Sequence, residues 1–304
     1  MSTNSRSIIE KADLAVSDMI ADGGYLNPEK QDEFYRKLID QPTLLNRVRT
    51  LQMSSPKKHI DKIGFGSRIM RAAPSSGTAL KSEDRARPTF DQVLLDTEET
   101  ISEVRIPYDA LEDNIEREGL QSTIMDMISQ RASLDLEELL INGSTSSNDP
   151  FLALFDGAIE LAEHNYDGSA LTSIDKTVFK KALDSMPTKY MRNLSAMEFF
   201  MSYHNVIEYR DKLADRETGK GDDYYLNRPT VYAFGVPISA AALMPNNAVL
   251  FTYPQNILFG VQRNVMVETD RDIRTREMII VLTMRLAINV EESNAMVKVT
   301  NLSV

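Results

Sequence analysis

The stretch RIMRAAPSSGTALKSEDRARP, residues 68–88, is a polar insertion between two segments that favour extended chain, residues 43–65 and 89–107. It has no apolar periodicity after Met70, and it contains two prolines, a Pro-Ser-Ser-Gly turn signal and five basic residues. We call it the tongue. The pattern predicts a long two-stranded excursion whose tip cannot bury itself against the rest of its own chain.

Charge is divided unevenly around the tongue. Residues 56–88 carry eight Lys or Arg and three acids, whereas residues 89–118 carry ten acids and two Arg. Complementary charges of this kind fix the register of an interface between copies more than they supply affinity. We therefore expect the tongue to rest on the acidic segment of a neighbouring copy, through its basic residues Arg68, Arg71, Lys81, Arg85 and Arg87.

The first 42 residues read as two short amphipathic helices. A capping box at Ser7-Ile-Ile-Glu10 opens the first helix, and the second stops before Pro42. Helices this short are too small to make a core alone, so they indicate an arm that docks on a neighbour or on a scaffold helix. The apolar stripe that would dock consists of Ile8, Ile9, Val16, Met19 and Ile20.

The remainder reads as an α+β chain, with helices early and strands late. The longest predicted helix runs from about Asn114 to Ile141 and stops at Asn142-Gly143. A helix capped within Thr172–Asp175 and a helix over 203–213 follow, with Val206 and Ile207 expected to face inwards. Strands are predicted at 196–201, 230–238, 248–253, 257–261, 265–268, 278–290 and 295–301.

Composition excludes several classes of function. The chain of 304 residues has no Cys, which removes disulfides, thiol nucleophiles and Cys-based zinc sites. A net charge of -11 argues against wrapping DNA, because phosphate neutralisation needs clustered Lys and Arg. There is no apolar run of about 18 residues and no secretory signal pattern, so we expect no membrane association.

Candidate catalytic or ligand residues form no set. The histidines, His59, His164 and His204, have no spacing typical of a metal site, and Glu137-Glu138 is typical of a solvated helix face. Basic residues of the tongue could contact nucleic acid, but no aromatic residue is interleaved with them for base stacking. We predict no enzyme activity, no cofactor and no metal site, and an acidic hydrolase or metal enzyme is the least favoured alternative.

Several stretches, in this order, resemble the major capsid proteins of tailed bacteriophages that have the Hong Kong 97-like fold. They are VRIPYDALEDNI (104–115), LDLEELLINGSTSS (134–147), FKKALDSMPTKYMRNLSAMEFFMS (179–202), YRDKLADRETGKGDDYYL (209–226), VYAFGVPISAAALMP (231–245), VMVETD (265–270) and MRLAINVEESNAMVKVTNL (284–302). The resemblance implies a helical N-terminal arm over 1–42 and an extended E-loop region over 43–107. It also implies a peripheral domain with a long spine helix, over 108–167 and 256–304, and an inserted axial domain over 168–255.

The function implied by the resemblance is a shell protein. Copies would self-assemble as hexamers and pentamers into the icosahedral or prolate head of a tailed phage, made in the bacterial host cytoplasm and located in the virion. The shell would enclose double-stranded DNA without sequence-specific binding. The short arm implies a separate scaffolding protein, or none, and a portal and a decoration protein are further expected partners. The alternative is an encapsulin-type nanocompartment shell, which shares the fold; the two arm helices favour a phage.

Overall fold

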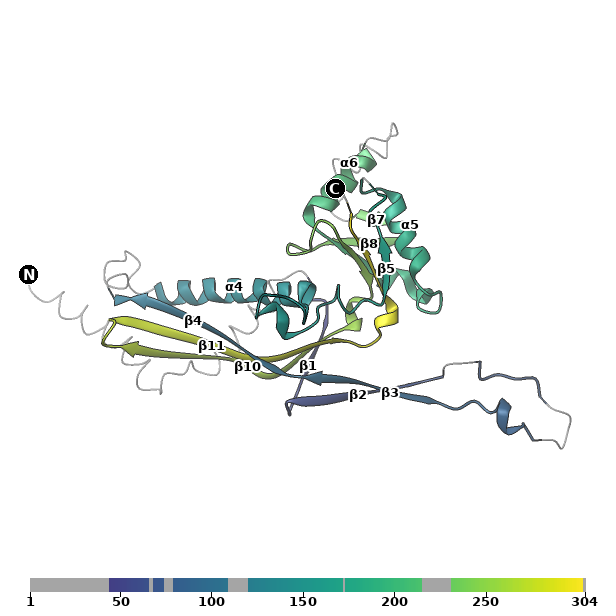
Figure 1. Ribbon diagram of the computed structural model, residues 1–304, viewed down its shortest axis with the longest axis horizontal. Helices are drawn as coiled ribbons and strands as arrows, with labels where there is room; N and C mark the ends of the chain where they lie inside the picture. The colour runs from purple at the N-terminus through teal and green to yellow at the C-terminus, as the bar shows by residue number, and fades with distance from the viewer. Residues whose placement is uncertain are drawn as a thin grey trace, which may run out of the picture.

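The computed structural model describes residues 44–65, 68–73, 79–108, 120–171, 173–214 and 231–302. These residues form an α+β chain with a four-stranded sheet, a six-stranded sheet and a two-stranded hairpin. Figure 1 shows how these parts are arranged. The α+β prediction is confirmed. The predicted docking residues of the arm, Ile8, Ile9, Val16, Met19 and Ile20, lie outside the described residues.

The four-stranded sheet carries the long helix on one face. Its strands lie in the order β1 (Arg49–Gln52), β10 (Ile257–Asp272), β11 (Glu277–Val290) and β4 (Glu98–Pro107). Strand β11 alternates in burial, because side chains of a strand point to opposite faces in turn. Its buried face consists of Ile280, Leu282, Met284, Leu286, Ile288 and Val290.

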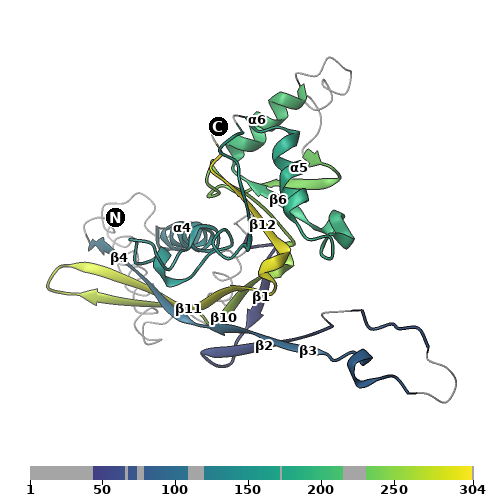
Figure 2. The same ribbon diagram turned by 45° about the vertical axis from the view of Figure 1, so that its right-hand side comes forward.

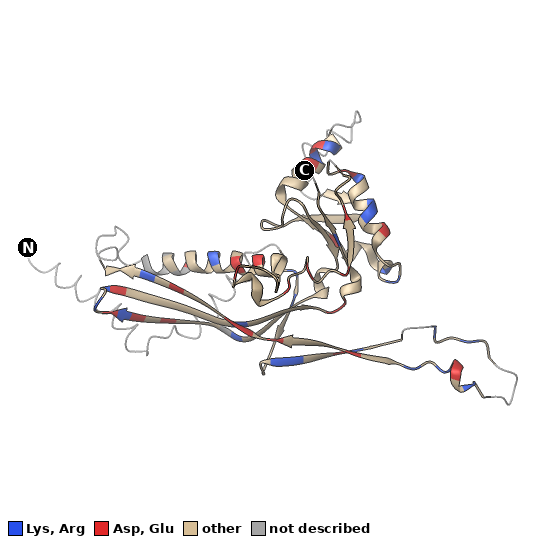
Figure 3. Cartoon of the chain, in the orientation of Figure 1, with Lys and Arg blue, Asp and Glu red and all other residues tan. Residues whose placement is uncertain are grey.

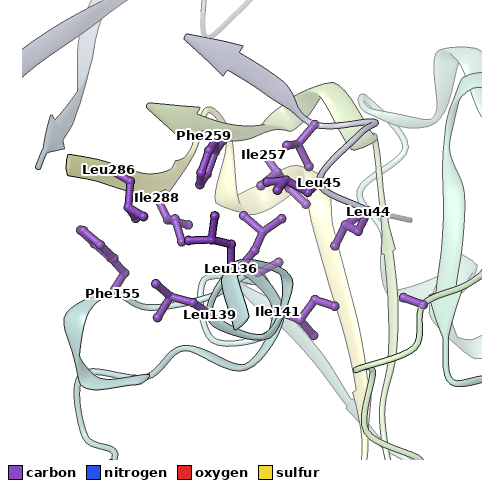
Figure 4. Close-up of a cluster of buried hydrophobic side chains, with 14 of the residues drawn as sticks. Leu44, Leu45, Leu136, Leu139, Ile141, Phe155, Ile257, Phe259, Leu286 and Ile288 are labelled. Carbon is purple, nitrogen blue, oxygen red and sulfur yellow. The ribbon is translucent and has the colours of Figure 1, made fainter. Parts of the chain in front are cut away.

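The long helix, α4 (Leu120–Asn142), packs on this face of the sheet (Figure 1). Leu136 and Leu139 from the helix meet Phe259, Leu286 and Ile288 from the sheet in one buried cluster, shown in Figure 4. The helix stops where the sequence predicts: Gly143 N–H still donates to the carbonyl of Leu139 at 3.0 Å, but the next N–H, that of Ser144, donates to the carbonyl of Leu152 instead. The predicted start of the helix, residues 114–119, lies outside the described residues.

The six-stranded sheet lies beyond the C-terminal end of α4 (Figures 1 and 2). Its order is β5 (His164–Asp167), β12 (Met296–Thr300), β9 (Val249–Thr252), β6 (Glu198–Met201), β8 (Val236–Ala240) and β7 (Val231–Ala233). One face packs on α5 (Lys176–Ser185) and α6 (Tyr203–Ala214), where Phe179 meets Phe199 edge to face at 4.9 Å. The other face contributes Phe200 and Leu250 to the cluster around α4, so the two sheets share a core.

The hairpin consists of β2 (Lys57–Gly64) and β3 (Thr89–Asp96), paired antiparallel. We call β2, β3 and the residues between them the E-loop hairpin. It projects away from both sheets, and the tongue lies at its far end (Figures 1 and 2). The predicted two-stranded excursion is therefore confirmed, although the strand that follows it, β4, leaves the hairpin and pairs with β11.

Two local expectations differ from the structure. The strand predicted over 230–238 is the hairpin β7–β8, because Phe234 and Gly235 both adopt positive φ, 51° and 83°, and turn the chain. Ile207 is 63% exposed, and the buried face of α6 carries Asn205, Tyr209 and Leu213. The predicted strand 295–301 is confirmed as β12, which pairs with β5 and β9 in the six-stranded sheet.

Candidate intersubunit surface

The two faces of the E-loop hairpin differ in what they contact. On the inner face, Ile60, Val93 and Leu95 pack on a small buried cluster that includes Met53 and Leu258. The carbonyl of Leu94 also accepts a hydrogen bond from the side-chain amide of Asn289, at 2.8 Å. These contacts fix the base of the hairpin to the four-stranded sheet.

The outer face carries apolar side chains that no described part of the subunit covers. Ile63 and Phe90 are register partners and are 68% and 73% exposed, and Leu94, on the same face, is 40% exposed. Nearer the tip, Phe65, Ile69 and Met70 are more than half exposed. Exposed apolar side chains gathered on one element mark an interaction surface. This surface was not predicted from the sequence, although strand segments with apolar residues on both faces were the available signal.

All five predicted basic residues of the tongue are exposed. Arg68, Arg71, Arg85 and Arg87 line a hollow of about 650 Å³, together with Glu83 and Asp84. Figure 3 shows this part of the chain lying apart from the charges of the body.

Two of these basic residues have weak contacts inside the tongue. Arg85 Nε donates to the carbonyl of Leu80 at 3.2 Å, and Lys81 Nζ lies 3.8 Å from Glu83. Among the described residues, no ion pair holds Arg68, Arg71 or Arg87 to the body of the protein. The structure leaves these charges available to a partner.

Several acids of the segment expected to receive the tongue already have partners in their own subunit. Glu99 binds both Arg263 and Arg285, at 2.5 and 3.2 Å. Hydrogen bonds from these two guanidinium groups hold the pKa of Glu99 below its usual value. The hydrogen bond with Asp96, at 2.5 Å, raises the pKa of Lys57.

Glu103 is also engaged, because it lies 2.6 Å from Arg105. The acids of β3 and β4 are therefore less free to bind a neighbour than their number suggests. Residues 109–118, which hold five of the ten acids of that segment, lie outside the described residues. The acidic acceptor for the tongue stays a prediction.

No enzyme-like arrangement forms among the described residues. His59 lies on β2, His164 on β5 and His204 on α6, so the three histidines belong to separate elements. The part of the chain that the structure describes holds no group of three or more side chains that could bind a metal ion. No helix within that part is both long enough and apolar enough to span a bilayer.

The reading of Glu137 as part of a solvated face is wrong. Its side chain is 1% exposed, and its carboxylate accepts the N–H of Leu44 at 2.7 Å. Glu137 therefore has a structural role: it holds the first described residues against the end of α4. Helix periodicity alone could not reveal this, because the covering segment is distant in the sequence.

No protein-family model matches the chain. Over 306 aligned residues the chain is 40% identical to the protein described as "Putative prophage capsid protein YqbE" of Bacillus subtilis (strain 168), and 97% of each protein is covered.

Solved capsid structures share the fold. The chain in the structure of the satellite phage P4 procapsid, which includes a size determination (Sid) protein, matches with a TM-score of 0.66 and 15% identity, over 99% of this chain and 98% of that chain. The capsid of a native GTA particle matches with a TM-score of 0.60 and 14% identity, over 86% and 90%. Mycobacterium phage Bobi gives a TM-score of 0.60 and 13% identity, over 85% and 90%.

Proposed function

This chain belongs to the family of phage major capsid proteins with the Hong Kong 97-like fold, and from this premise we propose that its E-loop hairpin joins neighbouring copies in the shell. The protein is a structural component of the virion capsid and self-assembles into the head shell. In the proposal, the outer face of the hairpin and the tongue lie across an adjacent copy.

One observation carries the proposal: the hairpin presents an exposed apolar face and exposed arginines that no described part of its own subunit covers. Ile63 and Phe90 supply apolar area, and Arg68, Arg71 and Arg87 supply charge. Apolar burial favours association in proportion to area. Charge complementarity adds register and orientation. Lys81 and Arg85, which have weak contacts within the tongue, would exchange them for contacts with the neighbour.

The division of the chain into functional parts is also a proposal. In it, residues 1–42 are the arm, 43–107 the E-loop region, 108–167 and 256–304 the peripheral domain, and 168–255 the axial domain. We change this division at two places: because β12 pairs with β5 and β9, we propose that residues 164–167 and 296–300 belong to the axial part instead of the peripheral domain. The four-stranded sheet with α4 would then be the peripheral domain, and α4 its spine helix.

The partners we propose follow from a shell of this kind. Copies of this chain would form hexamers and pentamers around double-stranded DNA, with a portal and a decoration protein as additional components. The P4 procapsid includes a size determination protein, which supports a separate assembly partner of the scaffolding kind for this chain. A net charge of -11 supports an inner surface that encloses DNA without gripping it. We propose a purely structural role, without enzyme activity.

The proposal is tested by shortening the tongue. Residues 73–86 are replaced by a Gly-Ser turn, which leaves β2, β3 and the inner face of the hairpin unchanged. We expect a folded subunit with an unchanged thermal transition that forms no shells in electron micrographs, with or without a scaffolding protein. Normal particles from the shortened chain would show that the tongue does not join subunits.

The encapsulin-type shell is the second candidate, because it shares the fold. The 40% identical relative is described as a prophage capsid protein, which favours the phage assignment. Purified particles distinguish the two, since a phage head incorporates a portal at one vertex and a nanocompartment is closed.

A further inference from the structure

The chain crosses from the four-stranded to the six-stranded sheet through Glu291 and Glu292, and this crossover is held rigidly. The carbonyl of Asn256 accepts the N–H of Glu291 at 2.8 Å, and its side-chain oxygen accepts the N–H of Glu292 at 2.9 Å. Its side-chain amide donates to the carbonyl of Glu292, also at 2.9 Å. Asn256 is only 8% exposed. A buried residue with three hydrogen bonds thus makes the crossover a fixed point.

Three separate parts of the chain converge on this fixed point. Arg49, on β1, lies 3.0 Å from the carboxylate of Glu291. Tyr190, before the 3-10 turn Met191–Ala196, lies beside the crossover, where it lines a hollow together with Asn256 and Glu291. Lys62, on β2, donates to the carbonyl of Glu291 at 2.5 Å and lies 3.4 Å from the carboxylate of Glu292. Of these groups, Lys62 is the one that belongs to the E-loop hairpin.

Lys62 occupies a particular place along the hairpin. Towards the base, Ile60, Val93 and Leu95 pack on the sheet. Towards the tip, in residues 63–65, 68–73 and 79–90, the structure has no hydrogen bond or ion pair from the hairpin to the described body. Lys62 therefore makes the outermost polar contact between the two. The described residues beyond it are supported through the hairpin itself.

The contact between Lys62 and the crossover lies where it can set the direction of the outer hairpin. The described residues beyond Lys62 are supported only through the hairpin. A small rotation of the hairpin at Lys62 therefore displaces the tip by a much larger distance. Its atoms are partly open to water, since the side chains of Lys62 and Glu292 are 21% and 34% exposed. A partly hydrated ion pair can open and close without unfolding of either sheet.

We propose that Lys62 acts as a latch. Its contacts with Glu291 and Glu292 set the direction in which the E-loop hairpin leaves the subunit. When the latch opens, the outer hairpin swings while the two sheets keep their relative position. The latch deepens the function proposed above, and rests on it for the role of the hairpin in the shell. Lys62 is then a positioning residue, whereas the exposed outer face of the hairpin and the tongue contact the neighbouring copy.

The latch can be tested on subunits without any shell. The chain has no cysteine, so two introduced cysteines define the only labelled sites. Phe90→Cys places a nitroxide on the hairpin just beyond Lys62, and Asp184→Cys places one on the exposed side of α5. Double electron–electron resonance on the full chain, diluted with unlabelled protein, gives the distribution of distances between them.

In this labelled chain, Lys62→Met is compared with Lys57→Met. Both remove an ammonium from β2, but Lys57 pairs with Asp96 across the hairpin rather than with the crossover. We expect Lys62→Met to broaden or shift the distance distribution and Lys57→Met to leave it unchanged. An unchanged distribution in Lys62→Met, or an equal change in both variants, would overturn the latch.

A second label pair separates a latch from general loosening. Gln130→Cys on α4 and Asp184→Cys on α5 report the position of one sheet relative to the other. We expect this distance to be the same in the chain that keeps Lys62 and in the chain that carries Lys62→Met. A change there would mean that Lys62 supports the packing of the sheets, and the proposal would be wrong. Because both readings come from unassembled subunits, failure of the shell proposal does not affect them.

Discussion

Ile63 and Phe90 stand directly opposite each other across the β2–β3 pair, and both point to the uncovered face of the hairpin, 68% and 73% exposed. Full burial of a side chain of this size contributes about 1.5–3 kcal/mol. An exposed ion pair contributes only about 0–1 kcal/mol. The apolar pair is therefore expected to supply affinity in the proposed intersubunit contact, and the arginines of the tongue its register.

The first prediction concerns this pair. Ile63→Ser with Phe90→Ser should change the free energy of unfolding by less than about 1 kcal/mol, because both side chains are exposed. It should weaken association strongly, as measured by sedimentation velocity. The matched control is Asp61→Ser with Gln92→Ser, an opposed polar pair on the same face. Equal loss of assembly in both variants would contradict an apolar contact.

The second prediction concerns the tongue. Charge reversal by Arg85→Glu with Arg87→Glu should impair assembly most at low salt, because screening is then least. Light scattering over a series of salt concentrations measures this. Lys176→Glu with Lys180→Glu on α5 makes the same change in net charge elsewhere, and should show a smaller effect. A defect independent of salt would argue against an electrostatic role.

The third prediction concerns the arm, whose structure is not described. Ile9→Asp with Val16→Asp should leave the thermal transition of the subunit nearly unchanged and should impair assembly. The reason is that a short amphipathic helix has to bury its apolar stripe against another molecule. Calorimetry and electron microscopy measure the two effects. Loss of folding would show that the arm belongs to the core of its own subunit.

The fourth prediction concerns the end of α4. A Cβ on Gly143 would lie 2.5 Å from the carbonyl oxygen of Phe155 and 2.6 Å from that of Leu139. Backbone atoms in a core cannot move aside freely, so Gly143→Ala should destabilise the subunit by roughly 2–3 kcal/mol. Gly64→Ala is the control, because the nearest atom would be 3.8 Å away. Urea denaturation compares them; similar midpoints would contradict this packing.

The fifth prediction concerns pH. Burial raises the pKa of Glu292, but the hydrogen bond from Asn294 and the charge of Lys62 outweigh it, so the pKa lies below the usual 4.5. A carboxylate with a lowered pKa stabilises the fold above its unfolded-state pKa, and this contribution is lost as pH falls through the folded value.

Wild type should therefore be more stable than Glu292→Gln near neutral pH, and the two urea midpoints should converge below about pH 4.5. When both proteins also carry Lys62→Met, the difference between their urea midpoints near neutral pH should become smaller. A gap that does not depend on pH would show that the charge of Glu292 contributes nothing.

The sequence predicted elements well where the pattern was long and local. The end of α4 at Asn142-Gly143 and the excursion around the tongue are examples, because helix stops and apolar alternation are set by neighbouring residues. The sequence did not predict that residues 230–238 form two strands joined by a turn, β7 and β8. A turn through Phe234 requires positive φ, which is uncommon for a residue other than glycine, and an apolar run gives no sign of it.

The candidate surface was predicted only in part. Exposure of the five basic residues follows from the polarity of the tongue and could be foreseen. The pairing of Glu99 with Arg263 and Arg285 could not, because it depends on which strands become neighbours. The same holds for Glu137, which is buried by a segment 93 residues away, and for Lys62, which has one partner 229 residues away and another, Asp91, across the hairpin.

The position of β12 has a consequence for biosynthesis. Residues 296–300 lie between β5 and β9, and β5 has β12 as its strand partner among the described residues. A nascent chain that has emerged from the ribosome only as far as β11 holds β5 without that partner. The six-stranded sheet can therefore close only after translation of β12, and long-range pairing of this kind is slow. Competence to assemble would then require that β12 has been translated, which keeps chains that lack β12 out of a growing shell.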